Sequence, residues 1–490
     1  MIFCARKNNM KLKDNKIYRM IIIPICVVLC FFGRFIPIPN LSGDAVGVLS
    51  IFLGSLILWL TIGIDWPSLL CIFSLSFLEN LSFAKVFSSS FGNSTFIFLL
   101  FTFICTYALS KTSLIKRVAI YFINLKLARK NDYWFTFLFL SAVLILGLFI
   151  SPSVLFVIIL PILNEIFELA NIEKEDKIAK ILMLGLAFTV SISSGMTPIA
   201  HVFPILAMNA ANITISPIAY MGLAIPVGLV TFLLMLVVFR IFLKIDENKL
   251  SKVDISKLKE NLEKVSKKDI FTVSIFGIVI LLWIIPSLFK EISPAFYNFI
   301  NQYGTAMPPL LGTLLLCIIR IDDKPIIKID DAFKNGVPWG SLIMCAATLV
   351  LGSALTNDAI GIKTFLQNSL GNSLGNIPEI LLLIIFIVWA AIQTNLSSNM
   401  VTATLVATIA SSIMMNMPSS SSLNINAVIC LIGMMSSFAF ATPPSMPHIA
   451  ITAGSEYCTT KDVLIYGSTV MAISVLAALL IGYPLGLLLV

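Results

Sequence analysis

Long apolar runs, separated by short polar segments, fill nearly the whole chain. Many of them approach the roughly 20 residues that an α-helix needs to cross a bilayer. The pattern therefore predicts an all-α polytopic membrane protein. The expected spans lie at residues 20–36, 45–64, 66–77, 91–109, 133–150, 154–169, 181–190, 217–243, 270–289, 306–319, 341–355, 380–392, 405–415, 425–440 and 463–489.

Four interruptions by hydroxyl, amide, Gly and Pro residues break the apolar pattern. They fall near 151–153 and 193–204 in the first half, and near 398–400 and 437–449 in the second. A polar group without a partner is costly in hydrocarbon, so broken backbone is tolerated there where it lines a wet, protein-enclosed site. For the polar stretch 394–404, the competing interpretation is helix packing through Ser and Thr.

Composition supports a membrane protein and narrows the function. The 490-residue chain is 58% hydrophobic and 12% charged, whereas a soluble domain carries about 25% charged residues. The net charge of +8 does not require a nucleic-acid partner, because Lys and Arg accumulate in cytoplasmic loops. We expect a multi-pass protein of the cell membrane with its basic N-terminus in the cytoplasm. The nine scattered cysteines indicate neither a metal site nor a disulfide framework.

Three local patterns recur in order along the chain. Ala108-Leu109-Ser110 matches Ala354-Leu355-Thr356 at an offset of 246 residues, Ser151 matches Ser398 at 247, and Thr197-Pro198 matches Thr442-Pro443 at 245. A near-constant offset predicts an internal duplication.

Charge predicts how the two copies are oriented. The amphipathic segment 111–132 carries six Lys or Arg residues, but its counterpart 357–379 carries one. These loops should therefore face opposite sides of the membrane, which makes the halves inverted repeats with the ligand near the midplane. The division we expect is 1–38 as the N-terminus and first helix, 39–243 and 270–490 as the repeats, and 244–269 as a cytoplasmic linker.

Residues at the breaks resemble those of the divalent anion:sodium symporters, the dicarboxylate, citrate and sulfate carriers of the ion transporter superfamily. Members carry Ser-Asn-Thr at each hairpin tip, with Pro-Ile ten residues after the Ser. Here Ser151 is followed by Pro161-Ile162, and Ser398-Asn399 opens the second copy. In the first motif Pro152 and Ser153 stand in place of Asn and Thr, and in the second Met400 replaces Thr.

The resemblance implies an architecture and a mode of action. It implies about eleven transmembrane helices with re-entrant hairpins and broken helices, a scaffold domain holding an elevator-like transport domain, and a homodimer. It also implies that the hairpin tips bind the substrate, with sodium beside each tip. Since proline lacks an amide side chain and an N–H, the first sodium site departs from the family pattern at Pro152.

The breaks contain no Lys or Arg at their centres, so an anion must be held by hydroxyls, amides, backbone N–H groups and helix N-termini. A co-bound cation would compensate its charge. Thr394 and Ser398, four residues apart, could converge on such a cation. The substrate-binding residues we expect are Ser151, Ser153, Thr197, Pro198, His201, Ser398, Asn399, Met400, Thr442, Pro443 and His448. The expected sodium ligands are Ser151, Thr394, Ser397, Ser398, Asn399 and Ser445.

The only two histidines, His201 and His448, each follow a Thr-Pro break. Either or both could contact the anion or carry a proton, although a lone histidine is more often structural.

The sequence thus favours a secondary active transporter of small di- or tricarboxylates coupled to sodium. The alternative within transport is a proton-coupled or exchange-type carrier of another anion, such as an inorganic oxyanion. A membrane enzyme or electron-transfer subunit is less well supported, because the chain shows no metal-ligand cluster and no P-loop. We expect no enzyme activity and no cofactor other than the coupling ion.

Overall fold

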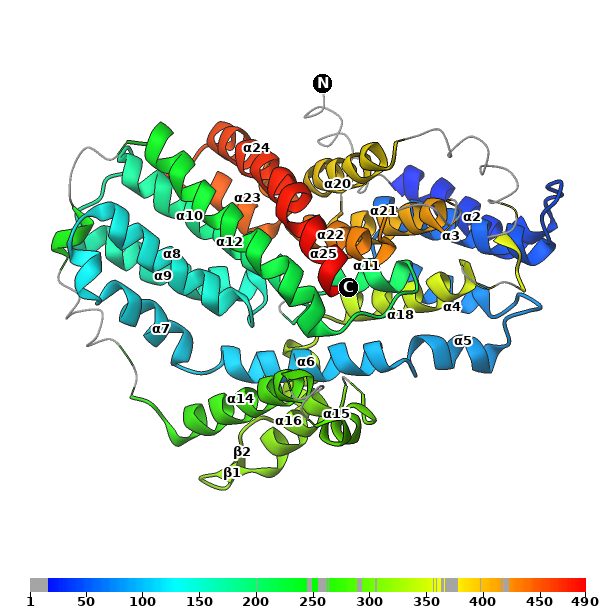
Figure 1. The fold of residues 1–490 in the computed structure, drawn as a ribbon, viewed down its shortest axis with the longest axis horizontal. Coiled ribbons are helices and arrows are strands. Elements are labelled where there is room, and N and C mark those ends of the chain that lie inside the picture. Colours follow the sequence, from blue (N-terminus) through cyan, green and yellow to red (C-terminus); the bar gives the residue numbers. More distant parts are fainter. Residues whose placement is uncertain are drawn as a thin grey trace.

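The computed structural model describes residues 16–199, 201–244, 249–253, 262, 264–288, 293–304, 306–355, 357, 359–362, 365, 378–396, 398–415, 417 and 423–490. Over these residues the chain is almost entirely helical (Figure 1), apart from one two-stranded ribbon formed by β1 (Arg320–Ile321) and β2 (Lys324–Pro325).

The first half contains eleven of the described α-helices. These are α2 (Lys16–Phe32), α3 (Gly43–Thr61), α4 (Asp65–Leu75), α5 (Phe83–Ser90), α6 (Ser94–Ser110), α7 (Leu114–Ile123), α8 (Asp132–Gly147), α9 (Pro152–Leu169), α10 (Lys177–Met196), α11 (Phe203–Ala210) and α12 (Pro217–Phe242).

The second half continues with helices of similar length. These are α14 (Lys267–Leu288), α15 (Pro294–Asn301), α16 (Met307–Ile318), α17 (Ile329–Asn335), α18 (Trp339–Leu355), α20 (Glu379–Leu396), α21 (Asn399–Met414), α22 (Ile425–Ser437), α23 (Pro447–Ala453), α24 (Thr460–Ala477) and α25 (Tyr483–Leu489).

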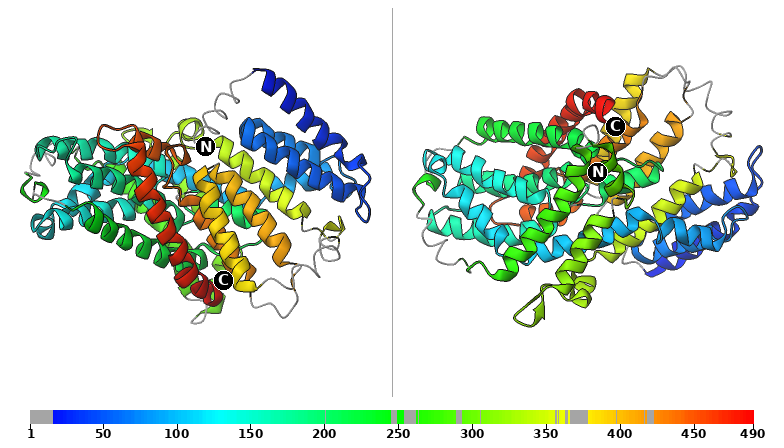
Figure 2. Two further views of the ribbon diagram at one scale, coloured as in Figure 1. Left: turned by 90° about the horizontal axis from the view of Figure 1, so that it is seen from above. Right: turned by 60° about the horizontal axis from the view of Figure 1, so that its bottom comes forward.

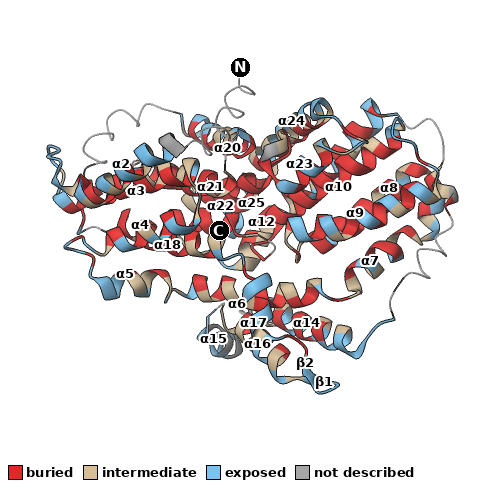
Figure 3. Ribbon diagram, turned by 180° about the vertical axis from the view of Figure 1, so that it is seen from behind, coloured by how far each residue is buried: buried red, intermediate tan, exposed pale blue. Residues whose placement is uncertain are grey.

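The helices confirm an all-α polytopic membrane protein. Within the described residues seven are long and apolar enough to cross a bilayer, or eight if the pair α17–α18, bent by 79°, is one span. Their exposed faces are apolar: on α12, Leu229, Leu233, Val237 and Ile241 repeat every four residues and are 41–57% exposed. Such a stripe needs lipid or protein to cover it. Conversely, α10 is buried over 94% of its span (Figure 3).

Helix bounds recur between the halves at nearly the offset found in the sequence. From α5–α6 to α17–α18 the first residues are 246 and 245 positions apart, and from the hairpin α8–α9 to the hairpin α20–α21 both are 247 apart. The broken helix α10–α11 likewise returns as α22–α23. In Figure 1 the first hairpin lies toward the left end of the molecule, and the second lies in its upper middle. The exact domain bounds stay a prediction.

The two ends of the long axis are formed by helices from the first half of the chain. Viewed from above, α8 and α9 lie toward one end and α2 and α3 lie at the other (Figure 2, left). The hairpin tips therefore lie between them, near the middle of the molecule.

The linker is attached to the base of the first hairpin. Asp132, 1% exposed at the start of α8, accepts hydrogen bonds from the backbone N–H groups of Lys249 (2.9 Å) and Ser251 (3.0 Å). Lys249 also pairs with Asp176, before α10, at 2.9 Å. The predicted solvated linker is thus attached through residues 249 and 251, and its residues 245–248, 254–261 and 263 lie outside the described part of the chain.

One helix begins earlier than the sequence predicted. The apolar run expected from residue 405 belongs to α21, which already starts at Asn399. The polar residues before it fit within a helix because the hydroxyls of Thr402 and Thr404 donate to the carbonyls of Ser398 and Met400, one turn back, at 3.0 Å each. That bonding satisfies Thr side chains in an apolar setting.

Candidate functional site

Both hairpins turn sharply where a serine precedes the second helix. Ser151 is the N-cap of α9 and Ser398 the N-cap of α21, each in an extended backbone conformation. Neither side chain caps its own helix. Both serine hydroxyls are therefore left for another partner, as are the first-turn N–H groups that every helix start presents.

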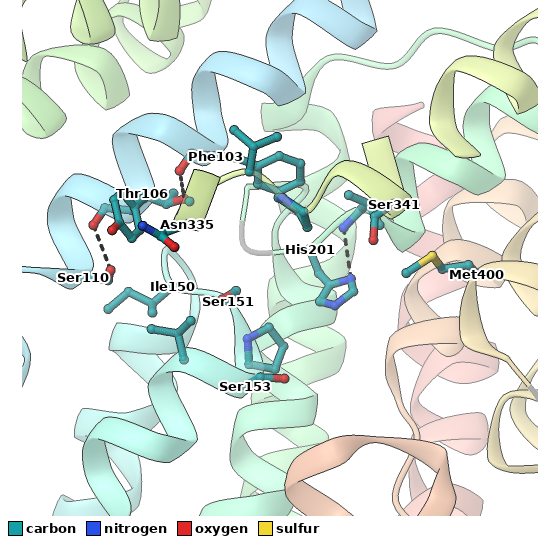
Figure 4. Close-up of a pocket in the computed structure, with 17 residues that line it drawn as sticks. Phe103, Thr106, Ser110, Ile150, Ser151, Ser153, His201, Asn335, Ser341 and Met400 are labelled. Atoms are coloured by element: carbon teal, nitrogen blue, oxygen red, sulfur yellow. Dashed lines mark hydrogen bonds between the residues drawn. The ribbon is translucent and has the colours of Figure 1, made fainter. Parts of the chain in front are cut away.

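A cavity of about 320 Å³, here called the central cavity, lies at the first hairpin tip (Figure 4). It is lined by the starts of four helices. Residues 151–154 belong to α9, residues 201–202 immediately precede α11, residues 337, 338 and 341 surround the start of α18, and Met400 lies in the first turn of α21. Residues of both tips therefore meet at one cavity.

The far wall of the central cavity comes from α6 and α17. Phe103, Thr106, Tyr107 and Ser110 line it from α6, and Asn335 from α17. Asp331 of α17 accepts hydrogen bonds from the Tyr107 hydroxyl (3.0 Å) and the Asn335 amide (2.7 Å). A carboxylate outside the cavity thus fixes two of its polar side chains.

No residue that lines the central cavity within the described chain is Lys, Arg, Asp or Glu. Its electrostatic character comes instead from helix N-termini, each carrying roughly half a positive charge, and from hydroxyl and amide groups. Three of these N-termini belong to long helices, since α9, α18 and α21 have 18, 17 and 16 residues. The arrangement can bind an anion without a fixed counter-charge.

His201 lies among these groups. Its Nδ1 accepts a hydrogen bond from the Val202 backbone N–H at 3.0 Å. A neutral ring must therefore carry its proton on Nε2, where it can donate. In Figure 4 the ring lies between Ser151 and Ser153 on one side and Ser341 and Met400 on the other. The structure thus brings four of the predicted substrate residues together: Ser151, Ser153, His201 and Met400.

His448 occupies a different environment. It is fully buried on α23, its Nε2 lies 2.7 Å from the Ser191 hydroxyl of α10, and its ring is 5.8 Å from that of Phe156 of α9. Its Nδ1 has no hydrogen-bond partner among the described residues. It does not line the central cavity, so the two histidines do not occupy matched positions at one site.

Thr197 and Thr442 fasten the broken helices to the hairpins. The Thr197 hydroxyl donates to the carbonyl of Leu148 at 2.6 Å, just after α8, and the Thr442 hydroxyl donates to the carbonyl of Asn395 near the end of α20. The two bonds are equivalent in the two repeats. The neighbouring Pro198 is buried and Pro443 half-buried, and neither lines the central cavity.

At the second tip Thr394 and Ser398 are not one helical turn apart, as the sequence had predicted, and their role as sodium ligands stays a prediction. The helix α20 ends at Leu396, so the two residues do not share a helical turn, and the Thr394 hydroxyl donates to the Ser436 carbonyl at 2.7 Å. The hydroxyl of Ser445 donates to the Thr442 carbonyl, also at 2.7 Å. Ser397 lies outside the described residues.

Asn399 remains the strongest group for a cation at this tip. The side chain is 5% exposed, and its Oδ1 has no hydrogen-bond partner within the described chain. A buried amide oxygen without a partner is costly, and such an oxygen is a suitable ligand for a hard cation. Ser398 beside it is half-buried.

Sequence reasoning missed Asn395 and the wall of the central cavity. The Asn395 Oδ1 accepts from the Ala441 N–H at 2.6 Å, and its Nδ2 donates to the Ala391 carbonyl at 2.8 Å. The recurrence of 108–110 as 354–356 did point to α6 and α18, but not to their contact with the tips.

Comparison with known proteins fits this geometry. No curated protein matches the chain. A family model described as the sodium:sulfate symporter transmembrane region matches residues 13–490, which is nearly the whole chain. The chain therefore belongs to the sodium:sulfate symporter family, whose members couple anion transport to sodium.

Proposed function

We propose that this protein is a secondary active transporter that carries small di- or tricarboxylate anions together with sodium, by elevator-type alternating access. The observation that carries the proposal is the central cavity, where the starts of α9, α11, α18 and α21 surround a volume without formal charge. Its size lies within the usual range for small-molecule sites, roughly 300–1,000 Å³.

Charge balance gives the reason for coupling. Two negative charges in a low-dielectric site are only partly stabilised by helix dipoles and hydroxyls. Sodium beside the second tip, where the Asn399 Oδ1 has no partner among the described residues, would supply the remainder and would favour binding of both solutes together. The anion contacts we assign are Ser151, Ser153, His201 and Met400.

One observation favours a second candidate, a proton-coupled or exchange-type carrier of an inorganic oxyanion. The first tip has Pro152 at the first position of α9, which supplies neither a side-chain oxygen nor an N–H. A carrier with one impaired sodium position would depend less on sodium, and the nearby His201 provides a group that can take up a proton.

Uptake into proteoliposomes tests the two candidates. Labelled succinate, malate, citrate and sulfate are each offered with and without an inward sodium gradient, at several external pH values. Sodium-dependent uptake of a carboxylate supports the first proposal, whereas sodium-independent, pH-dependent sulfate uptake supports the second. Pro152→Asn should raise the sodium cooperativity of uptake if Pro152 impairs the first sodium position. Val157→Leu serves as the control, because Val157 lies on the same helix, is 57% exposed and does not line the central cavity.

We further propose a homodimer in the cell membrane with a cytoplasmic N-terminus. The excess of Lys and Arg in residues 1–19 and 111–132 supports that orientation, because such loops stay in the cytoplasm.

A further inference from the structure

A second cavity, of about 170 Å³, lies at the start of α6, and we call it the α6-start cavity. Its walls come from the α5–α6 junction, the end of α11 and the last turns of α18. Eight of its ten described lining residues carry a hydroxyl or amide, and none is charged. So polar a cavity suits water or a polar solute rather than packing.

This cavity is the repeat counterpart of the central cavity. Moving along the sequence by 246 residues takes Ser89 to Asn335 and Thr95 to Ser341, and it takes Tyr107 to Ser353. The first two pairs lie at the α5–α6 and α17–α18 junctions, and the third lies on α6 and α18. In each pair one member lines the α6-start cavity and the other lines the central cavity.

Three helices place one end in each cavity. Thr95 and Tyr107 are twelve residues apart on α6, as are Ser341 and Ser353 on α18. At about 1.5 Å per helical residue, each pair is separated by roughly 18 Å. That is more than half of the hydrocarbon thickness of about 30 Å, so the two cavities lie at different levels along these helices.

The short helix α11 separates the two cavities. Residues 201–202 before it line the central cavity, and Asn209 near its end lines the α6-start cavity. The helix packs tightly on α18, since a Cβ at Gly352 would lie 2.2 Å from the Asn209 carbonyl oxygen. The Asn209 amide also donates to Cys345 of α18 at 3.2 Å. The described residues of the α6-start cavity include neither hairpin tip.

We propose that Ser89, Thr95 and Ser353 form a second substrate-contacting surface, used when the carrier faces the side of the membrane opposite to the one served by the central cavity. There the small anion carried by the tips meets hydroxyls of α5, α6 and α18, in place of their counterparts Asn335, Ser341 and Tyr107. The inference rests on the proposed function, because it takes the central cavity to be an anion site.

Single cysteine variants at matched positions test this. Thr95→Cys and Ser341→Cys are reconstituted in proteoliposomes and exposed to a membrane-impermeant thiol reagent from one side at a time. Ser88→Cys is the matched control, because Ser88 is exposed on α5 and lines neither cavity. The unmodified protein gives the background from its own cysteines. Ser353→Cys repeats the test if the Thr95 variant does not fold.

We expect Thr95→Cys and Ser341→Cys to be labelled from opposite sides. Succinate, malate, citrate and sulfate are each added at saturation with sodium, and the anion that is transported should reduce labelling of both variants. Ser88→Cys should react equally with and without anion. Labelling of Thr95→Cys and Ser353→Cys from the same side as Ser341→Cys would overturn the inference. It would also be overturned if an anion that protects Ser341→Cys does not change the labelling of Thr95→Cys and Ser353→Cys. If none of the anions tested protects Ser341→Cys, the proposed function is overturned instead.

Discussion

Asn395 connects the second hairpin to the second broken helix, and Asn395→Leu tests how much that connection stabilises the protein. Leucine has nearly the same size, and the equivalent residue of the first repeat is Leu148. The substitution removes the Oδ1 that accepts from the Ala441 N–H at 2.6 Å, in a side chain only 2% exposed. It also removes the bond from Nδ2 to the Ala391 carbonyl, 2.8 Å long.

The magnitude follows from which groups lose their partners. The Ala391 carbonyl lies one turn earlier in α20, so it keeps the backbone N–H of residue 395 as its donor. The buried Ala441 N–H loses its acceptor, and the buried Phe438 carbonyl loses a long hydrogen bond of 3.4 Å from Nδ2. The unsatisfied buried donor alone costs about 1–3 kcal/mol. We therefore expect the free energy of unfolding to fall by about that amount. The Thr442 hydroxyl bonds to the backbone carbonyl of residue 395, so that contact should survive.

The assay is thermal and chemical unfolding of purified protein in detergent, compared with Ile392→Leu. Ile392 lies on the same helix but is 46% exposed, so its variant should unfold like the unmodified protein. Equal stability of the two variants would show that the Asn395 side chain does not hold the break. If Asn395→Leu unfolds like the unmodified protein but no longer supports uptake, the Asn395 side chain acts in ligand binding instead.

Thr197→Val and Thr442→Val should each lower the free energy of unfolding by about 0.5–1.5 kcal/mol, because each removes the hydroxyl donor of a partly buried carbonyl. Thr→Ser at either position should restore most of this stability, and a loss from only one of the two Val variants would contradict their equivalence. Gly352→Ala should separate α11 from α18, because its Cβ would meet a backbone oxygen, and hydrogen exchange in α11 should rise. Burial would raise the pKa of Asp176, but hydrogen bonds from Lys249 and a backbone N–H hold that pKa below its usual value. The Lys249–Asp176 pair therefore stabilises the fold fully at pH values above the ordinary Asp pKa, and this stabilisation is lost as pH falls through the lowered pKa of Asp176. In Lys249→Ala the free energy of unfolding should depend less on pH in this acidic range. The effect should be small, because both side chains are partly exposed.

The sequence could predict the helices that have a clear apolar pattern and recognisable boundary residues. Ser151-Pro152 marks a helix start because proline is favoured in the first turn, and the structure begins α9 there. Periodicity could not separate a broken helix from a loop: residues 203–210 are too few to show a pattern, yet they form the fully buried α11. The sequence also does not show that the Ser436 carbonyl lies beside Thr394 and accepts a hydrogen bond from its hydroxyl.

The candidate site shows the same limit. His201 and His448 are alike in sequence context, but one lines the central cavity and the other pairs with Ser191 in the interior. The difference depends on the packing of α23 against α9 and α10, and no local pattern encodes that contact. Matched offsets predicted the repeats because duplication leaves a trace in the order of residues.

The segment that follows α12 is bound to the bases of two helices, through Asp132 at the start of α8 and Asp176 before α10. If the first hairpin moves across the membrane during a transport cycle, residues 249–251 must move with it, and their distance to α14 must change. Ser251 is attached to Asp132 through its backbone N–H, so a fluorescence donor on its side chain leaves this bond in place. With an acceptor on α14, each movement would then appear as a change in energy transfer, at a place remote from solute binding.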